Sequence, residues 1–270
     1  MGAFGYDGKR VLVIGGATGM GAAAAALVTQ LGGKVAVMDV ADVGYPADAV
    51  ARVDLRDRAA VDAAVDEVGG PIDGVFACAG VADGTPGLMT INFVAQRHVV
   101  ERLVEAGTLG RGGSVVMISS VAGLGWQQAL PTVLDFLRAD GWDAAVEWVE
   151  ANGADNYGFS KMAINAYVAD SAFRLLQQGI RINAVLPGPT DTPLARANAD
   201  TWLTFGADYR EAAGVDTLVP EQIAHAMAFL GSDAASGVNG VTMLVDHGHV
   251  SSGITGSFEN PIVKLLLGIQ

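Results

Sequence analysis

The stretch VLVIGGATGMGAAAAALV (residues 11–28) decides the fold, because it runs from an apolar strand through a glycine turn into an alanine-rich helix. Gly15, Gly19 and Gly21 mark the turn. A backbone that turns this tightly brings its amide groups and the helix N-terminus close to a pyrophosphate, where the helix dipole favours negative charge. Strand-to-helix packing alone is the alternative explanation of the glycines, since a lone glycine pattern is a weak motif.

The alternation of strand and helix continues along the chain. Apolar, β-branched runs that predict strands occupy residues 10–15, 34–39, 74–80, 114–120, 181–188 and 241–246. Helical patterns lie between them at residues 19–31, 57–68, 91–106, 157–178 and 220–230. Strands without polar alternation are buried on both faces. The pattern therefore predicts a Rossmann-like, doubly wound α/β fold, with a parallel sheet covered by helices on both faces in a single domain.

Composition bounds the class of protein. The 270 residues are 51% hydrophobic and 17% charged, which is enough for one large domain with a substantial core. The net charge of -13, from 29 acidic and 16 basic residues, argues against a surface that binds nucleic acid through its phosphates. Cys78 is the single cysteine, so it forms no internal disulfide, and its apolar neighbours predict a buried thiol.

The two ends of the chain give expectations about location. The N-terminus enters a strand without the pattern of a signal peptide, and no apolar run is long enough to span a membrane. With the reduced cysteine, this predicts a cytoplasmic protein. The C-terminal tail (250–270) ends in an apolar segment with one cation, Lys264, and we expect it to pack on the core or on a partner subunit rather than on a membrane surface.

An acidic residue follows the second predicted strand. Asp39 lies 18 residues beyond Gly21, where the strand brings a carboxylate to the adenosine ribose of a bound dinucleotide. It would accept hydrogen bonds from the ribose hydroxyls and repel a 2′-phosphate, and Thr18 stands where an arginine or lysine would be the phosphate partner. NAD is therefore predicted over NADP. Asp54, near the end of a third strand, either binds the adenine amino group or serves as a helix N-cap or loop carboxylate.

Residues 157–161 read YGFSK, which places Tyr157 and Lys161 four residues apart on one face of a helix. By itself this spacing is weak evidence of chemistry. An ammonium beside a phenol favours the phenolate, however, and would lower the pKa of the tyrosine toward the range useful for proton transfer.

These motifs, in this order, resemble the short-chain dehydrogenase/reductase family over nearly the whole chain. The matching segments are GGATGMG (15–21), ACAG (77–80), INFVA (91–95), ISS (118–120), YGFSK (157–161), NAVLPGPTDT (183–192) and LVDHG (244–248). Three positions depart from the family pattern, since Ile14 replaces a threonine, Cys78 an asparagine and His247 a glycine. The resemblance implies an oxidoreductase that uses a nicotinamide cofactor.

The resemblance also implies roles for single residues. Tyr157 would be the general acid/base and Lys161 its partner, which also binds the nicotinamide ribose. Ser120 would hold the substrate oxygen, and Asn92 would position a water that relays protons to Lys161. The predicted cofactor-binding residues are Gly15, Thr18, Gly19, Met20, Gly21, Asp39, Asp54, Leu55, Ala79, Gly80, Tyr157, Lys161, Pro187, Gly188, Thr190 and Thr192. No metal site is expected, because His247 and His249 have no acidic or cysteine neighbour in the sequence besides Asp246.

Two segments interrupt the regular alternation. Residues 126–153 hold two short amphipathic patterns and place 36 residues between Ser120 and Tyr157, a helical insertion that resembles the bacterial 3α-hydroxysteroid dehydrogenase/carbonyl reductase branch of the family. Its tryptophans could anchor the insertion, cover the site or contact a partner. Residues 193–219 have the length and composition of a substrate lid. Family resemblance implies a homodimer or homotetramer.

The apolar side chains of the predicted lid, with two scattered arginines, favour an apolar secondary alcohol or its ketone, first of all a hydroxysteroid or another cyclic alcohol. A 3-hydroxyacyl thioester is the competing substrate, although its anionic carrier would favour a more basic entrance. A dinucleotide-binding sensor without catalysis is the alternative of another class. Such proteins usually lose the tyrosine or the lysine, and this chain has both.

Overall fold

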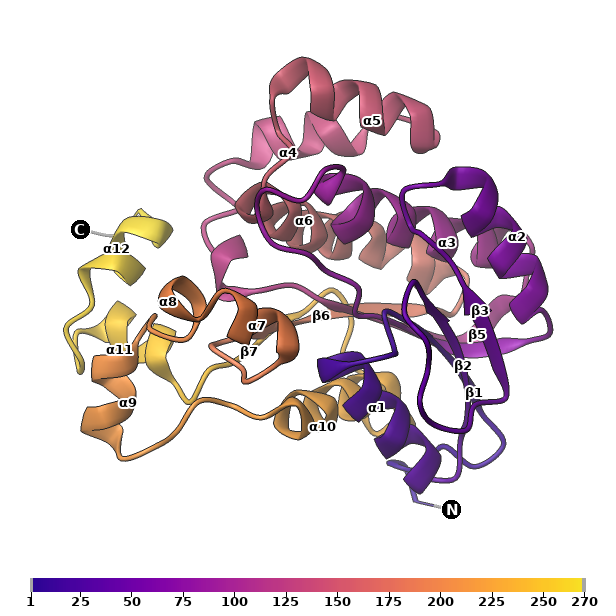
Figure 1. Cartoon of the computed structure of the whole chain (residues 1–270), viewed down its shortest axis with the longest axis horizontal. Coiled ribbons are helices and arrows are strands. Elements are labelled where there is room, and N and C mark those ends of the chain that lie inside the picture. Colours follow the sequence, from indigo (N-terminus) through magenta and orange to yellow (C-terminus); the bar gives the residue numbers. More distant parts are fainter. Residues whose placement is uncertain (1, 269–270) are drawn as a thin grey trace.

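A computed structural model describes residues 2–268. Its centre is a seven-stranded sheet in which all neighbouring strands are parallel and the order is β3-β2-β1-β4-β5-β6-β7 (Figure 1). The strands are β1 (Arg10–Ile14), β2 (Lys34–Asp39), β3 (Ala49–Arg52), β4 (Ile72–Ala77), β5 (Leu109–Ile118), β6 (Arg181–Pro187) and β7 (Thr242–Val245). The predicted doubly wound α/β fold is confirmed.

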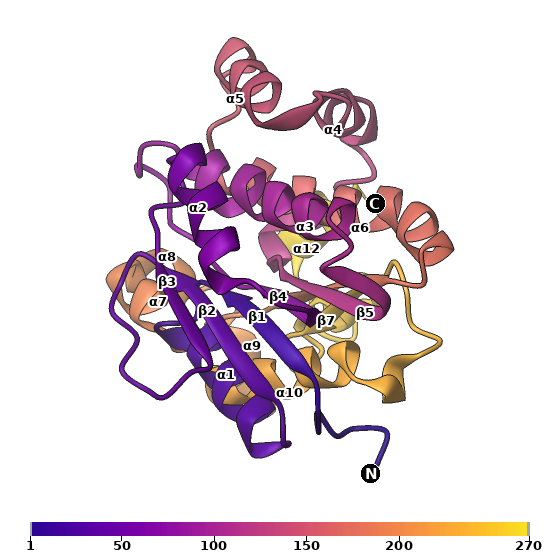
Figure 2. The same cartoon turned by 90° about the vertical axis from the view of Figure 1, so that its right-hand side faces the viewer.

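Helices cover the two faces of this sheet, as Figures 1 and 2 show from perpendicular directions. One face carries α1 (Gly19–Gln30) and α10 (Pro220–Gly231), and the other carries α2 (Arg58–Val68), α3 (Ala95–Glu105) and α6 (Tyr157–Gln177). Each face has its own hydrophobic core, because alternate residues of a buried strand point to opposite sides. In β1, Leu12 and Ile14 face one core while Val11 and Val13 face the other.

The order of the strands positions the site. Strand β1 pairs with β2 on one side and with β4 on the other, so the connections leave β1 and β4 in opposite directions. In open α/β sheets this arrangement opens a crevice at the carboxyl ends of the strands. The glycine turn that follows β1 and the segment that follows β4 form the two sides of that crevice.

Two elements differ from the sequence prediction. The third strand, β3, is only four residues long and ends at Arg52, because the residues after it turn toward α2. The helix predicted over 91–106 begins as a π-helical turn (Thr90–Val94) before α3. A π-turn is frequent at functional sites and carries no distinctive sequence signal.

The insertion forms two helices, α4 (Leu130–Leu137) and α5 (Gly141–Asn152), as its amphipathic patterns predict. They pack above α3 and α6 at one edge of the molecule (Figure 1). Phe136 is fully buried, with its ring centroid 5.4 Å from that of Phe93 and 5.6 Å from that of Phe159. Trp142 is buried and Trp148 stacks on Phe159, so these two tryptophans anchor the insertion to the body of the domain.

The predicted lid is a series of short helices, α7 (Pro193–Ala197), α8 (Ala199–Trp202) and α9 (Ala207–Ala213). Beside it the C-terminal segment forms α11 (His249–Thr255) and α12 (Pro261–Leu267), and short 3-10 turns lie at Val121–Gly123 and Asp233–Ala235. The tail packs on its own chain through Val263, which is buried against Val121 and Val250. The last two residues of the predicted tail (269–270) lie outside the described residues. Among residues 2–268, no helix combines the length and the apolar character that crossing a membrane requires.

Phe136→Ala should lower the free energy of unfolding by about 3–5 kcal/mol, because it leaves a cavity between the insertion, the π-helical turn and α6. Urea unfolding monitored by circular dichroism measures this change. The matched control is Phe173→Ala on α6, whose side chain is 73% exposed, and its change should stay within about 0.5 kcal/mol. Equal effects of the two substitutions would show that the insertion is not part of the core.

Candidate active site

The glycine turn after β1 approaches the end of β4 so closely that side chains are excluded. Gly15 has a φ of 79°, and a Cβ atom there would lie 2.5 Å from the backbone of Ala79. A Cβ atom at Gly21 would overlap the carbonyl of Gly15. Gly19 differs from these two, since a Cβ atom there would project toward Thr192 at 3.5 Å and fill the space between the turn and the lid. Close packing therefore explains Gly15 and Gly21. Gly19 instead leaves an open space, a cradle, between the turn and the lid.

This cradle is part of a cleft, named here the glycine-turn cleft. Thr18 is the N-cap of α1 and makes no side-chain hydrogen bond to the helix, so the first N–H groups of α1 face the cleft without a side-chain cap. The residues that line the cleft are Gly15, Thr18, Gly19, Met20, Gly21, Met38, Asp39, Val40, Val53, Asp54, Leu55, Cys78, Ala79, Gly80, Val81, Ile91, Thr192, Pro193 and Leu194.

Two carboxylates lie at the outer end of the cleft. Asp39 accepts backbone hydrogen bonds from Ala17 at 2.8 Å and from Ala41 at 2.9 Å, which fix its orientation beside the turn. Asp54 is ion-paired with Arg56, and this pair lowers the pKa of the Asp54 carboxyl. The N-cap of α2 is Asp57, so Asp54 is a loop carboxylate and not a helix N-cap, and its contact with an adenine stays a prediction.

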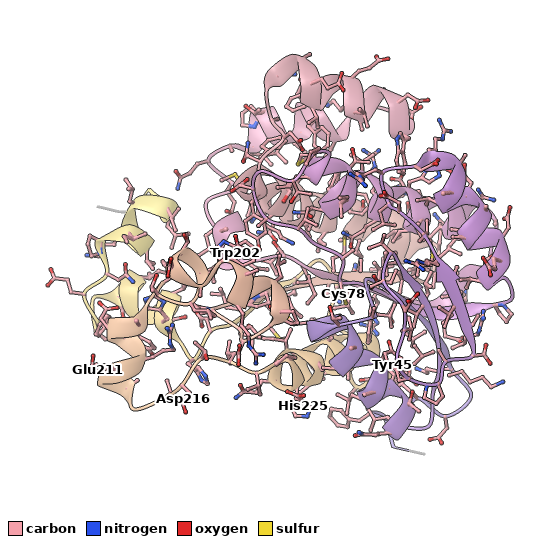
Figure 3. All side chains as sticks on the ribbon, in the orientation of Figure 1. Tyr45, Cys78, Trp202, Glu211, Asp216 and His225 are labelled. Atoms are coloured by element: carbon pink, nitrogen blue, oxygen red, sulfur yellow. The ribbon has the colours of Figure 1, made fainter. Side chains whose placement is uncertain are left out.

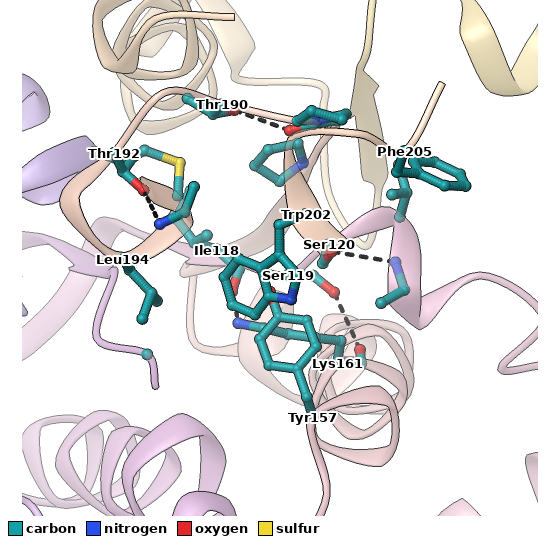
Figure 4. A pocket seen from close by; sticks show the side chains of 18 of the residues that line it. Ile118, Ser119, Ser120, Tyr157, Lys161, Thr190, Thr192, Leu194, Trp202 and Phe205 are labelled. Carbon is teal, nitrogen blue, oxygen red and sulfur yellow. Dashed lines mark hydrogen bonds between the residues drawn. The ribbon is translucent and has the colours of Figure 1, made fainter. Parts of the chain in front are cut away.

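A second cavity, the tyrosine cavity, opens beside the first and has a volume of about 380 Å³. Figure 4 shows its side chains gathered around Tyr157 and Lys161, with Trp202 of the lid over the tyrosine. Its lining residues are Met20, Cys78, Gly80, Ile118, Ser119, Ser120, Val121, Ala122, Tyr157, Lys161, Pro187, Gly188, Pro189, Thr190, Thr192, Leu194, Ala195, Thr201, Trp202, Phe205 and Leu266. Met20, Cys78, Gly80, Thr192 and Leu194 line both spaces, which are therefore contiguous.

Helix α6 holds Tyr157 and Lys161 on the face that meets the cavity. Asn156 is the N-cap and accepts a hydrogen bond from the Phe159 amide, while Asp83 accepts one from the Tyr157 amide at 2.7 Å. The Lys161 Nζ atom lies 5.3 Å from the centroid of the Tyr157 ring and donates to the Ile118 carbonyl at 3.0 Å. An ammonium has three donors, so this single contact with the described residues leaves capacity for a partner in the cavity.

The expected lowering of the tyrosine pKa is not what the structure gives. Burial raises the pKa of Tyr157 to about 12, although a hydrogen bond from Ser120 acts in the lowering direction. Burial also lowers the pKa of Lys161 to about 8. The prediction was wrong because it counted the attraction between the two groups without the loss of solvation, which disfavours the charged form of each.

Two serines follow β5 and have different surroundings. Ser119 is buried and donates to the carbonyl of Lys161 at 3.1 Å, so it braces α6. The Ser120 Oγ atom accepts from the Ala122 amide at 3.1 Å, so its own O–H is left to donate toward Tyr157 in the cavity that both residues line (Figure 4). The residue singled out by the sequence, Ser120, is the better placed donor for a bound substrate.

Asn92 lies in the π-helical turn and is fully buried. Its side-chain oxygen accepts from the Val81 amide at 2.8 Å, and its amide nitrogen donates to the Val81 carbonyl and to Ser160 Oγ. Asn92 thus clamps the segment that follows β4 and, unlike the other predicted site residues, lines neither space. Its role in a proton relay stays a prediction.

The segment after β6 closes the cavity from the lid side. A Cβ atom at Gly188 would lie 2.9 Å from the Cβ atom of Asp246. Thr190 donates to the Gly188 carbonyl at 2.9 Å, and Thr192 accepts from the Ala195 amide as the N-cap of α7. Both threonines are buried at positions that also line the cavity.

The histidines form no metal site, and among the described residues no cluster of three His, Cys, Asp or Glu side chains could hold a metal ion. His247, which replaces a family glycine, has a φ of 58° and so keeps the left-handed backbone that glycine favours. His249 is buried beside Asn260. His225 lies exposed on α10, away from Trp202 and Cys78 (Figure 3).

Two residues at the site were missed from the sequence, and a third agrees with it in part. The residue Cys78 is partly exposed where the two spaces meet, but burial of its thiol raises the pKa to about 12, as expected of a buried thiol. Asp83 holds the start of α6 from a loop without a recognisable motif. Leu266 reaches the cavity from the C-terminal tail, whose apolar character was the one signal that it packs on something.

Comparison with known proteins places the chain among dehydrogenases. A family model described as short chain dehydrogenase matches residues 9–132, and one described as Enoyl-(Acyl carrier protein) reductase matches residues 144–250. The chain is 34% identical to cis-4-hydroxycyclohexanecarboxylate dehydrogenase of Sinomonas cyclohexanicum, over 90% of this chain and 97% of that protein.

Two further similarities concern hydroxysteroid dehydrogenases. The 3-alpha-hydroxysteroid dehydrogenase/carbonyl reductase of Comamonas testosteroni is 28% identical, over 88% of this chain and 95% of that protein. The crystal structure of the 3-alpha-hydroxysteroid dehydrogenase from Pseudomonas sp. B-0831 complexed with NADH superposes with a TM-score of 0.71 at 27% identity, over 93% of this chain and 100% of that one. The resemblance inferred from the motifs and the insertion is confirmed.

The buried lysine predicts how stability depends on pH. Lys161 has a pKa of about 8 in the folded chain against an ordinary value of 10.5, so between these values the unfolded state binds more protons. Stability should therefore rise with pH through this window. From pH 7 to pH 10 the free energy of unfolding of the wild type, relative to Lys161→Met, should increase by about 2–3 kcal/mol.

Urea unfolding of the two proteins at both pH values measures the difference. Lys34→Met, which removes a lysine whose side chain is 72% exposed, is the control and should keep the pH dependence of the wild type. If the free energy of unfolding of Lys161→Met rose with pH as much as that of the wild type, the lowered pKa of Lys161 in the folded chain would be wrong.

Proposed function

The chain belongs to the short-chain dehydrogenase/reductase family, and on this premise we propose that it is an NAD-dependent oxidoreductase that interconverts an apolar secondary alcohol and its ketone. One observation carries the proposal. Tyr157, Lys161 and Ser120 lie in an apolar-walled cavity that is contiguous with a glycine cleft at the switch point of a parallel sheet. A proton donor and a dinucleotide site thus open onto the same space.

The residues of the glycine-turn cleft fit a dinucleotide. The first turn of α1 offers backbone N–H groups and the positive end of the helix dipole to a pyrophosphate, and Gly19 leaves the room that a side chain would fill. Asp39 offers a carboxylate, held by two backbone amides, to the hydroxyls of the adenosine ribose. Asp54 and Leu55 would flank the adenine, and Pro187, Thr190 and Thr192 the nicotinamide end. When bound, NAD supplies the hydride chemistry of the reaction.

The chain's own residues handle the proton. In ketone reduction the Tyr157 hydroxyl would donate a proton to the substrate oxygen, and the Ser120 O–H would donate a hydrogen bond to the same atom as negative charge develops. With a pKa of about 12, Tyr157 is protonated at neutral pH, which suits this direction. Alcohol oxidation needs the phenolate, so its rate should rise with pH. Lys161, with unused N–H donors beside the tyrosine ring, would stabilise that phenolate.

The walls of the cavity favour a largely apolar substrate. Val121, Leu194, Trp202, Phe205 and Leu266 supply apolar surface, and Lys161 is the one cationic side chain among the described lining residues. A cyclic alcohol also agrees with the substrates for which two of the relatives are named, a hydroxycyclohexanecarboxylate and a hydroxysteroid.

A 3-hydroxyacyl thioester is less well matched. Its anionic carrier calls for cations at the entrance, yet the two arginines of the lid are engaged elsewhere. Arg196 is ion-paired with Asp191, and Arg210 donates to the carbonyls of Phe205 and Leu203. A non-catalytic sensor would not need a proton donor and a lysine at the cavity. Assembly as a homodimer or homotetramer stays a prediction.

Tyr157→Phe should retain NADH binding and lose turnover by about 10²–10⁴-fold, because the ring remains while the transferable proton is removed. Initial rates of NADH formation with a panel of hydroxysteroids and smaller cyclic alcohols measure the loss, and fluorescence titration with NADH measures binding. Turnover of the variant at the wild-type rate would overturn the role of Tyr157. An absence of wild-type activity with every alcohol, despite NADH binding, would count against the proposed reaction.

Asp39→Ala should lower the preference for NAD over NADP by about tenfold or more, which corresponds to about 1.4 kcal/mol or more, because repulsion of the 2′-phosphate is lost. The ratio of kcat/KM values for the two cofactors measures it. Asp42→Ala removes a neighbouring carboxylate whose side chain is 87% exposed and should leave the ratio unchanged. A wild type that used NADP as well as NAD would contradict this role of Asp39.

A further inference from the structure

The C-terminal helix α12 is fixed at its start by one side chain. The Asn260 side-chain oxygen accepts hydrogen bonds from the Ile262 and Val263 amides, both at 3.1 Å. This leaves its amide nitrogen to donate to His249 Nε2 on α11. Since the amide of Asn260 is a donor there, His249 is the acceptor and carries its proton on Nδ1. Helix α12 is therefore docked in a defined orientation.

Two successive leucines of α12 differ in their surroundings. Leu265 is 79% exposed, whereas Leu266 is one of the residues that line the tyrosine cavity. Val263, one turn earlier, is fully buried against Val121 and Val250. Val121, on which Val263 packs, also lines the cavity. The contact that holds α12 in place therefore lies beside the space that Leu266 lines.

The backbone at Leu266 is held by the start of the insertion. The Leu266 carbonyl accepts a hydrogen bond from the Gln128 side chain at 3.4 Å. Gly125 lies so close to the same carbonyl that a Cβ atom there would overlap it. Helix α12 thus rests against the segment that connects Ser120 with the insertion, and its distance from the catalytic residues is set by direct contact.

The lid is joined to the C-terminal helices through His249 on α11. The His249 ring lies 5.1 Å from the ring of Phe205 and 4.9 Å from that of Tyr209, measured between centroids. Phe205 lines the cavity, and Tyr209 donates to the His247 carbonyl at 2.8 Å. The lid and α12 therefore form one continuous boundary of the substrate space.

We propose that α12 is the end wall of the substrate cavity and that Leu266 determines the size of the ring system that enters, an inference that rests on the proposed function. Substrates compact enough to fit between Leu266 and the Tyr157–Trp202 pair, whose rings are 4.8 Å apart, are accepted without moving the wall. Larger fused-ring alcohols meet the Leu266 side chain. Specificity in pockets of this kind changes by about 10-fold or more for each methylene added or removed.

The test compares the wild type with Leu266→Ala, Leu266→Phe and the matched control Leu265→Ala, which shortens the neighbouring exposed leucine. Each protein is assayed with NAD and cyclohexanol, 2-decalol and a 3-hydroxysteroid. Leu266→Ala should raise the kcat/KM ratio of the steroid to cyclohexanol by about 10-fold or more, Leu266→Phe should lower it, and Leu265→Ala should leave it unchanged. Equal ratios for Leu266→Ala and Leu265→Ala would overturn the proposal.

A second measurement keeps this result separate from the proposed reaction. Calorimetric titration of the same three alcohols into the NADH-saturated proteins reports binding without turnover. If no alcohol is oxidised, the proposed reaction fails, while a size-dependent affinity that shifts in Leu266→Ala still supports the wall. If Leu266→Ala binds the three alcohols in the same order of affinity as the wild type, the proposed end wall is wrong. If Leu266→Ala does not fold, Leu266→Val replaces it in both measurements, and the same outcomes support or overturn the proposal.

Discussion

The contact between the turn after β1 and the backbone after β4 is the constraint on which the rest of this structure depends. With Gly15 packed against Ala79, the two central strands end at one level and the crevice between them stays narrow. The same closeness directs the first turn of α1 into the crevice and places Gly80 between the two spaces. A side chain at Gly15 would separate β1 from β4 and displace both the cradle and Asn92's anchor at Val81, because interiors are packed too densely to absorb an extra atom.

The proposed catalytic pair, Tyr157 and Lys161, is held by burial rather than by mutual attraction. Lys161 is buried and bonded to the Ile118 carbonyl, so the lysine ties α6 to the end of β5, and Ser119 ties the same two elements from the other side. At neutral pH burial disfavours the charged form of Lys161, which is a cost to stability that the packed insertion helps to offset, whereas Tyr157 is buried as the neutral phenol. Phe136 and Trp148 pack on Phe159 in the first turn of α6, so the insertion supports the turn that carries the tyrosine.

The sequence was sufficient to predict the sheet, its main helices and the residues that meet in the two spaces, because strand burial and glycine geometry are local properties with a recognisable period. It was misleading about the pKa of Tyr157, which depends on how completely the folded chain removes water. The contribution of Asp83 also depends on which loops meet in space. Leu266 belongs to the same group, since nothing in PIVKLLLGIQ distinguishes the leucine that faces the cavity from its exposed neighbour.

The chemistry and the specificity of this molecule rest on parts of unequal stability. Of the proposed catalytic side chains, Ser120 follows the central strand β5 and Tyr157 and Lys161 lie on the long helix α6, and both elements share the main cores, so these positions are as stable as the fold itself. The proposed end wall is different, because α12 buries Val263 completely and Leu267 partly, leaves Ile262 and Leu265 exposed, and is also held by hydrogen bonds through Asn260 and Gln128. Elements with few buried apolar contacts open at a smaller free-energy cost than the whole domain. On the proposed function, the accepted substrate size could therefore change through α12 while the position of Tyr157 is preserved.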